Sequence, residues 1–209
     1  MTKVHFENVS IDISTILDQQ NKNFLLSDYE KSILKFIIDW INQKNSWTIT
    51  TSGSTGKPKS ISINRNLMKY SASQTIQALK IQKQTNSLLC INAGFVGGKM
   101  MIVRSLENNM NIVVQNPSTK SLQPFKLNHP IHFAAFVPIQ VLSFLRDPQQ
   151  RTILNKIDKV IIGGAPMPHE AINEIQRFNT RFWQTYGMTE TYSHVALRQL
   201  NGSNKTASF

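Results

Sequence analysis

The chain has 209 residues, of which 40% are hydrophobic and 17% charged, a composition typical of a globular protein with one substantial core. It contains no apolar run of the roughly 18 residues that a membrane span needs and does not begin with a signal peptide, so we expect a cytoplasmic protein without a membrane partner. The net charge is +11, and the basic residues are scattered along the sequence, which disfavours nucleic acid as a partner. The charge suits an enzyme with polyanionic substrates, or a fragment of a longer protein whose other part is acidic.

The first eighty residues predict strands and two helices. Residues 4–13 alternate apolar and polar side chains, which predicts an edge strand. Ser27 and Glu30 match a capping box, and the apolar side chains that follow recur at the spacing of an amphipathic helix. Short strands are expected at 47–51 and 60–63, joined by a loop of Gly, Ser and Thr. A helix over 64–80 is expected to turn Leu67, Tyr70, Ala78 and Leu79 partly inward.

Strands and helices alternate in the rest of the chain. Helices are expected near 98–106, from Pro138 onward and over 168–178. This order predicts an α/β fold with a largely parallel sheet. The single cysteine, Cys90, excludes an internal disulfide and a thiolate zinc site, and lies in an apolar run that predicts a buried thiol. The strands are expected near 88–91, 111–114, 132–137, 158–162 and 181–185.

The loop between the first two short strands after residue 46 can bind phosphate. Gly53 and Gly56 allow positive φ angles that turn backbone amides toward an anion. A P-loop is excluded, because Thr51 stands where that motif has its first glycine and Pro58 where it has Ser or Thr. A flexible turn is the alternative. Hydroxyl groups and positive charge come from Ser52, Ser54, Thr55, Lys57 and Lys59.

Residues 51–59 resemble the phosphate-binding loop of the adenylate-forming superfamily, which includes acyl-CoA synthetases, and they fit its pattern Thr-Ser-Gly-Ser/Thr-Thr-Gly-x-Pro-Lys. Residues 161–166 resemble the superfamily's Gly-Gly-Ala segment, and residues 186–190 its Tyr-Gly-x-Thr-Glu motif. The resemblance implies a layered αβ sandwich, of which residues 1–209 form part of the N-terminal domain. It also implies that a ribose-binding Asp, a hinge and a C-terminal domain with a catalytic Lys lie outside these residues, so we expect the chain alone to be weakly active or inactive.

The resemblance also implies a reaction and its site residues. A carboxylate attacks the α-phosphorus of ATP, giving an acyl-adenylate and pyrophosphate, and CoA then displaces AMP. Lys59, Thr189 and Glu190 are expected to be catalytic, with Glu190 also binding Mg²⁺. Nucleotide contacts are expected from Thr51, Ser52, Gly53, Ser54, Thr55, Gly56, Lys57, Gly163, Gly164, Ala165, Tyr186 and Gly187.

The short stretch before the loop and the segment 94–106 resemble the o-succinylbenzoate–CoA ligases of menaquinone biosynthesis. Phe95 stands where most of the superfamily has a His that borders the acyl pocket. Lys99 or Arg104 is expected to meet the second carboxylate of the acid. The alternative is a solvated Lys99 and an Arg104 that only packs. His194 is expected either to line the acyl pocket or to have a structural role.

Three other functions remain open from the sequence alone. The acid could be another aryl or acyl carboxylate, which keeps the same chemistry. The chain could be a truncated nucleotide-binding or scaffolding module without catalysis. A DNA- or RNA-binding protein is the third alternative, and its signature would be steeply salt-dependent binding.

Overall fold

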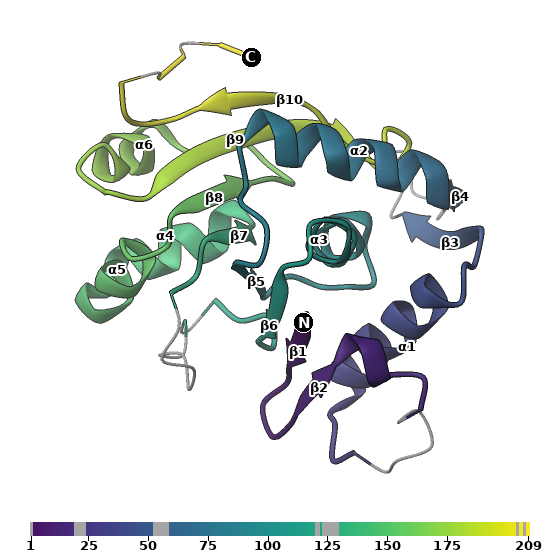
Figure 1. Ribbon diagram of the computed structural model, residues 1–209. Coiled ribbons are helices and arrows are strands. Elements are labelled where there is room, and N and C mark those ends of the chain that lie inside the picture. Colours follow the sequence, from purple (N-terminus) through teal and green to yellow (C-terminus); the bar gives the residue numbers. More distant parts are fainter. Residues whose placement is uncertain are drawn as a thin grey trace.

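The computed structural model describes residues 2–18, 24–51, 59–119, 122, 130–203, 205–206 and 208–209. Within these residues, eight strands form one sheet in the order β10-β9-β8-β7-β5-β6-β1-β2, drawn in Figure 1. Its strands are β1 (Lys3–His5), β2 (Ser10–Asp12), β5 (Asn86–Leu89), β6 (Asn111–Val114), β7 (Phe133–Phe136), β8 (Lys159–Ile162), β9 (Arg181–Met188) and β10 (Ser193–Gln199).

The sheet is parallel from β1 to β9, and an antiparallel hairpin closes each edge. The predicted α/β fold with a largely parallel sheet is therefore confirmed. The prediction of one edge strand over residues 4–13 is wrong in detail. Phe6 donates a backbone hydrogen bond to the Val9 carbonyl at 2.9 Å, so the chain turns here and forms two strands. Since β1 pairs with β6, β2 is the edge.

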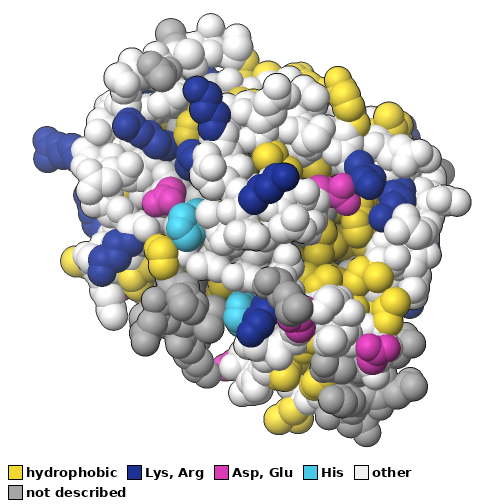
Figure 2. Space-filling view, viewed as in Figure 1, with side chains coloured by type: hydrophobic (Ala, Val, Ile, Leu, Met, Phe, Trp, Pro, Cys, Tyr) yellow, Lys and Arg dark blue, Asp and Glu magenta, His cyan; other side chains and the backbone are white. Residues whose placement is uncertain are grey.

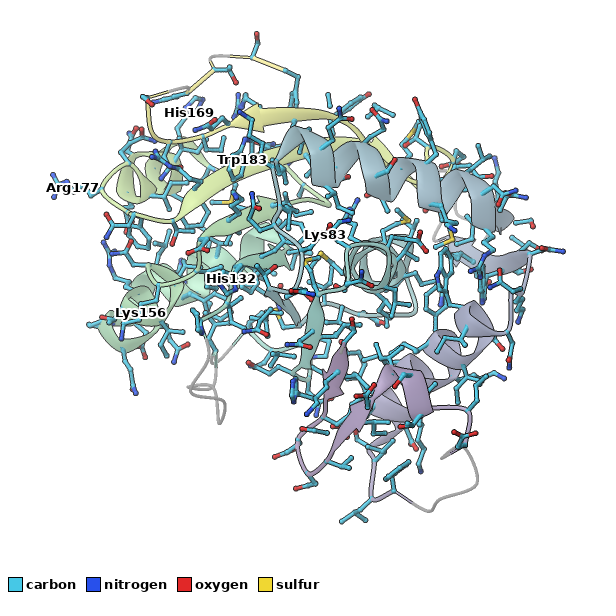
Figure 3. The ribbon with its side chains drawn as sticks, viewed as in Figure 1. Lys83, His132, Lys156, His169, Arg177 and Trp183 are labelled. Atoms are coloured by element: carbon cyan, nitrogen blue, oxygen red, sulfur yellow. The ribbon has the colours of Figure 1, made fainter. Side chains whose placement is uncertain are left out.

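Helices cover both faces of the sheet, as Figure 1 shows. One core lies under α1 (Asp28–Ile41), α2 (Arg65–Ala78) and α3 (Val96–Glu107). The other lies under α4 (Pro138–Arg146), α5 (Pro148–Leu154) and α6 (His169–Ile175). Trp183, labelled in Figure 3, packs from β9 against the first core. The protein is thus a three-layer α/β/α structure; a short 3-10 helix, η1 (Ile13–Thr15), follows β2.

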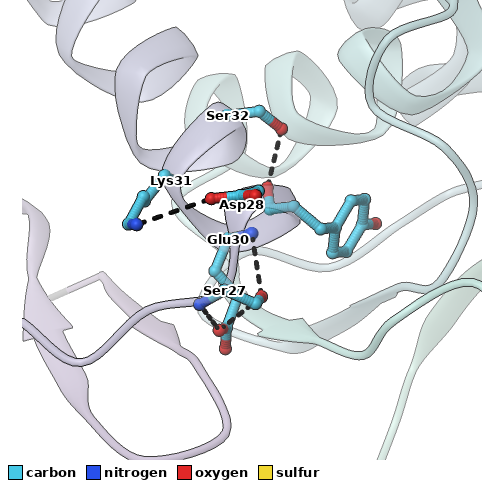
Figure 4. Close-up of polar contacts among 6 residues, drawn as sticks. Ser27, Asp28, Glu30, Lys31 and Ser32 are labelled. Atoms are coloured by element: carbon cyan, nitrogen blue, oxygen red, sulfur yellow. Dashed lines mark hydrogen bonds and ion pairs between the residues drawn. The ribbon is translucent and has the colours of Figure 1, made fainter.

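A capping box starts α1, as the sequence predicts (Figure 4). The Ser27 hydroxyl accepts a hydrogen bond from the Glu30 backbone N–H at 3.3 Å, and a Glu30 carboxylate oxygen accepts one from the Ser27 N–H at 2.9 Å. The other oxygen of Glu30 accepts from the Glu7 N–H at 2.8 Å. One buried carboxylate therefore starts the helix and ties it to the hairpin between β1 and β2.

The inward face of α2 differs from the prediction. Leu67 is 49% exposed and Tyr70 65% exposed. Arg65 is buried and its guanidinium lies 4.1 Å from the Trp40 ring, which sets the rotation of the helix. The buried positions are consequently Arg65, Met68, Ala72, Thr75 and, just after the helix, Leu79.

A separate antiparallel ribbon, β3 (Ser46–Thr51) and β4 (Lys59–Asn64), precedes α2. Both strands agree with the predicted ones. The short α5 was not predicted. Asp147 caps it by accepting hydrogen bonds from the backbone N–H groups of Gln149 and Gln150, so the chain begins a second helix directly after α4.

Basic side chains are spread over the molecule. Figure 2 shows Lys and Arg dispersed across the visible face rather than gathered in one patch. Lys156 and Arg177 are exposed and point away from the core in Figure 3. In the part of the chain that the structure describes, none of the helices has the length and apolar character needed to cross a membrane.

Candidate active site

A cavity of about 820 Å³ opens at the carboxyl ends of β5, β7, β8 and β9. Ligands of open α/β sheets bind at this end of the strands, because the loops that leave the strands diverge there. Apolar side chains form much of the wall, among them Phe95, Val96, Phe136 and Met188. The cavity therefore suits a ligand with an apolar body and a few polar groups.

The Gly-Gly-Ala segment forms one side of the cavity. Gly163 and Gly164 line it directly after β8, and the Gly163 N–H donates to the Phe136 carbonyl at 3.1 Å. Gly164 has a φ of 91°, a conformation that a residue with a Cβ atom rarely adopts. Ala165 is exposed beside them and does not line the cavity.

The Tyr-Gly-Met-Thr-Glu segment spans the end of β9 and the turn into β10. β9 continues to Met188, three residues beyond the predicted strand end, because β10 pairs with it as far as Ser193. Gly187 and Thr189 line the cavity, whereas Glu190 is exposed at the tip of the hairpin. A Cβ atom at Gly187 would collide with the Ser193 backbone, so the hairpin closes only over glycine.

Tyr186 points away from the cavity wall. Successive side chains of a strand alternate between faces, and Thr185 and Gly187 both line the cavity. Tyr186 is 61% exposed, and its ring centroid lies 5.8 Å from that of Phe209. The Tyr186 ring therefore lies on the opposite side of β9 from the apolar part of the cavity.

Arg104 brings a positive charge into the cavity wall from the last turn of α3. Its side chain is 1% exposed, and one Nη donates to the Ser193 hydroxyl at 2.9 Å. No described carboxylate forms an ion pair with it, and its Nε has no hydrogen-bond partner among the described residues. Burial lowers the pKa of Arg104 to about 9, so the guanidinium is still a cation at neutral pH.

His194 lies beside Arg104 in the same wall. Its Nε2 is 3.1 Å from the Thr75 hydroxyl, and its Nδ1 is 3.4 Å from the Ser193 hydroxyl. Burial, and then the charge of Arg104, lower the pKa of His194 to about 3. The imidazole is therefore neutral at physiological pH. The described residues contain no group of three or more His, Cys, Asp and Glu side chains that could hold a metal ion.

Similarity to known proteins identifies the family of the chain. Residues 13–208 match the family model described as "AMP-binding enzyme". The chain belongs to the AMP-binding enzyme family. The predicted resemblance to adenylate-forming enzymes is thereby confirmed.

Two curated relatives in this family are the 2-succinylbenzoate–CoA ligases of Salmonella typhimurium and Bacillus subtilis. The first is 26% identical over 84% of this chain and 37% of its own length. The second is 26% identical over 69% of this chain and 30% of its own length. The chain thus spans about a third of the length of these curated relatives.

Solved structures of the family have the same fold. An acyl-CoA synthetase (AMP-forming)/AMP-acid ligase II-like protein from Dyadobacter fermentans superimposes with a TM-score of 0.80 at 34% identity, over 90% of this chain and 53% of that one. An O-succinylbenzoate coenzyme A synthetase from Bacillus subtilis, in complex with ATP and magnesium ion, superimposes with a TM-score of 0.63 at 24% identity, over 73% of this chain and 32% of that one.

Most of the predicted phosphate loop lies outside the described residues, namely Ser52, Gly53, Ser54, Thr55, Gly56 and Lys57. Its two ends are described. Thr51 and Lys59 face each other as the last pair of the β3–β4 ribbon. The ribbon therefore brings the start and the end of the loop together, while the roles assigned to the loop stay predictions.

Lys99 and Arg104, the two predicted acid-binding cations, have different positions. The Lys99 ammonium donates to the Ala93 carbonyl at 3.0 Å and lies 4.9 Å from the centroid of the Phe36 ring. Lys99 does not line the cavity, whereas Arg104 does. Phe95 also lines it and is 56% exposed, so it borders the cavity without closing it.

Sequence reasoning missed Gln140, which fixes three parts of the cavity wall. Its Nε2 donates to the carbonyls of Cys90 at 2.9 Å and Ser118 at 3.2 Å, and its Oε1 accepts from the Val137 N–H at 3.1 Å. The ends of β5 and β7 and the loop after β6 are held together in this way. The available signal was a Gln three residues after the N-cap position of α4.

Proposed function

We propose that the protein is an ATP-dependent carboxylic acid–CoA ligase that works through an acyl-adenylate, with o-succinylbenzoate as its acid. Its place would then be menaquinone biosynthesis. The observation that carries the proposal is one cavity in which Gly163, Gly164 and Thr189 face an apolar wall that contains the buried cation of Arg104. Membership of the AMP-binding enzyme family and the names of its relatives support it.

Arg104 is the proposed contact for the second carboxylate of the acid. A buried guanidinium without a counter-ion costs several kcal/mol, and a bound carboxylate offsets that cost. The planar fork of Arg binds a carboxylate through two parallel hydrogen bonds. The aryl part of the acid would lie against the apolar wall, including Phe95 and Phe136. His194 is neutral and adds no charge to this contact.

The nucleotide is proposed to bind at the hairpin side of the cavity. The backbone of Gly163, Gly164 and Ala165 is proposed to lie against the adenine. Tyr186 would stack on the adenine only after its ring leaves Phe209, because in this structure the ring lies on the opposite side of β9 from the cavity. Gly187 permits close approach of the backbone, and the Thr189 hydroxyl would donate to the α-phosphate. Residues 51–57 and Lys59 are proposed to hold the pyrophosphate that leaves.

Glu190 fits a magnesium ion that is bound together with a nucleotide. Its carboxylate is exposed at the hairpin tip next to Thr189, and no ion pair engages it among the described side chains. Mg²⁺ typically takes one or two protein carboxylates and completes its shell with phosphate oxygens and water. When bound, it supplies positive charge that stabilises the phosphate oxygens. CoA is the proposed second substrate.

The test uses the complete gene product with ATP, Mg²⁺, CoA and a panel of carboxylic acids, and mass spectrometry identifies the CoA ester. We expect an ester of o-succinylbenzoate and much less product from benzoylpropionate, which keeps the aryl ketone but has one carboxylate. An ester formed only from other acids would retain the ligase chemistry and remove the proposed substrate. If no acid gave an ester, the non-catalytic nucleotide-binding module would replace the proposal.

A further inference from the structure

A row of hydrogen bonds leads from Arg104 through Ser193 and His194 to Thr75 in α2. The donor and the acceptor of each hydrogen bond in this row can be assigned. The Thr75 hydroxyl donates to the Ser71 carbonyl, one turn earlier in α2, at 3.0 Å. A hydroxyl has a single proton, so Thr75 can only accept in its second contact, which is the one to His194 Nε2 at 3.1 Å. His194 must therefore carry its proton on Nε2.

The same reasoning continues to the cavity. Because His194 is neutral, its Nδ1 has a lone pair and accepts from the Ser193 hydroxyl at 3.4 Å. The Ser193 oxygen is then an acceptor for Arg104, whose Nη2 donates to it at 2.9 Å. Ser193, His194 and Thr75 each accept one hydrogen bond and donate the next, between Arg104, which only donates, and the Ser71 carbonyl, which only accepts.

We propose that Ser193, His194 and Thr75 are positioning residues, which hold the Arg104 guanidinium in the orientation that receives the second carboxylate of the acid. This inference rests on the proposed function and adds residues from two further elements, β10 and α2. The row uses one nitrogen of the Arg104 fork and leaves its Nε without a described partner. The hydrogen bond to Ser193 restrains the guanidinium while donors remain for the ligand.

The backbone supports this role of the hairpin. Tyr192 has a φ of 60° and Ser193 a φ of 139°, and both values are uncommon for residues with a side chain. The Thr191 hydroxyl donates to the Ser193 carbonyl at 2.7 Å, and the Ser71 hydroxyl donates to the Tyr192 carbonyl at 3.5 Å. Strained conformations persist where surrounding contacts enforce them, and they cluster at functional sites.

The first test is spectroscopic and does not depend on catalysis. Nitrogen-15 chemical shifts of the His194 ring are measured in the complete gene product at neutral pH. We expect a protonated Nε2 and an unprotonated Nδ1. We also expect the His194 signals to move in Thr75→Val but not in Thr152→Val. Exposed Thr152 also donates to a carbonyl one turn earlier in its helix, but this helix is α5, which contains no histidine. An Nδ1-protonated or doubly protonated ring would overturn the proposal.

The second test separates positioning from general damage. In Ser193→Ala and Thr75→Val we expect the KM for o-succinylbenzoate to rise by roughly tenfold, because the charged donor loses its fixed orientation. The kcat, the KM for ATP and the KM for benzoylpropionate should change little, and Thr75→Ser, which keeps the hydroxyl, should restore affinity. Equal losses with both acids would contradict the positioning role. An enzyme that made no ester from any acid would instead count against the proposed function, and the ring nitrogen signals would still test the row.

Discussion

At the scale of single residues, the two cations in the apolar helix α3 are the most informative about the acid-binding site. Lys99 and Arg104 are five positions apart in α3, which places them about 140° apart around the helix axis. They cannot both face one ligand, and the structure turns Arg104 to the cavity and Lys99 to Phe36. A sequence shows that two cations occur in an apolar helix. It does not show which of them meets the cavity, because that depends on the rotation of α3 against its neighbours.

The substitution Arg104→Met separates stability from binding. We expect its free energy of unfolding to be unchanged or about 1–2 kcal/mol higher than that of the parent protein, because an unpaired buried charge is replaced by an apolar side chain of similar length. The KM for o-succinylbenzoate should rise at least tenfold. Denaturant unfolding and steady-state kinetics measure the two effects.

Arg65→Met is the matched comparison. Arg65 is also buried, but its guanidinium donates to the Trp40 carbonyl and lies over the Trp40 ring. Loss of these contacts should lower the free energy of unfolding by about 1–3 kcal/mol. If Arg104→Met were as destabilising as Arg65→Met, Arg104 would be a structural residue and its proposed role in acid binding would lose its physical basis.

At the scale of elements, local signals set where helices begin, and packing sets which face is buried. The capping box of α1 is readable because both partners lie within four residues of each other. The buried face of α2 is not, because Arg65 must reach Trp40 in another helix before the rotation is fixed. The length of β9 likewise depends on β10, which pairs with it through Met188.

Glu30→Ala tests the element-level role of the Glu30 carboxylate. The backbone N–H groups of Glu7 and Ser27 and the Ser27 hydroxyl all donate to it, so we expect a loss of about 2–3 kcal/mol in the free energy of unfolding. Burial raises the pKa of Glu30, but these hydrogen bonds outweigh it and the pKa lies below its usual value. The contribution is therefore present at neutral pH and is lost as the pH falls through the folded-state pKa.

Asp28→Ala is the control for charge in the first turn of α1. Its side chain is fully exposed and lies 3.5 Å from the Lys31 ammonium, so removal should change stability little at any pH. Urea unfolding of both variants at neutral and acidic pH measures the difference. Equal losses in the two variants would mean that Glu30 acts only through the helix dipole.

At the scale of the whole molecule, the parallel sheet gathers residues that are far apart in sequence. Phe95, Gly163 and Thr189 follow three different strands, and all lie at the carboxyl edge because those strands run in the same direction. The two cores on the faces of the sheet hold that edge in place. The described part of the molecule thus builds the floor and walls of the cavity.

The adenylation rate of the 209-residue chain by itself is a prediction about the whole molecule. Released pyrophosphate is measured for the isolated 209-residue chain and for the complete gene product, each with ATP, Mg²⁺ and o-succinylbenzoate. We expect the isolated chain to be at least about 100-fold slower, because the family resemblance implies a further domain with a catalytic Lys, whose charge stabilises the transition state. Equal rates would show that these residues suffice for adenylation.

The sequence by itself determined the fold class, most of the strands and helices, and the family, because each of these depends on local patterns and contiguous motifs. Hydrophobic periodicity depends on neighbours in the chain, and the motifs at 51–59, 161–166 and 186–190 are read residue by residue. Only the tertiary structure decided that Arg104 rather than Lys99 faces the cavity and that Thr75, His194 and Ser193 form one row with it. These contacts join α2, α3 and β10. Contacts between distant segments arise from packing and cannot be predicted from the residue type at any single position.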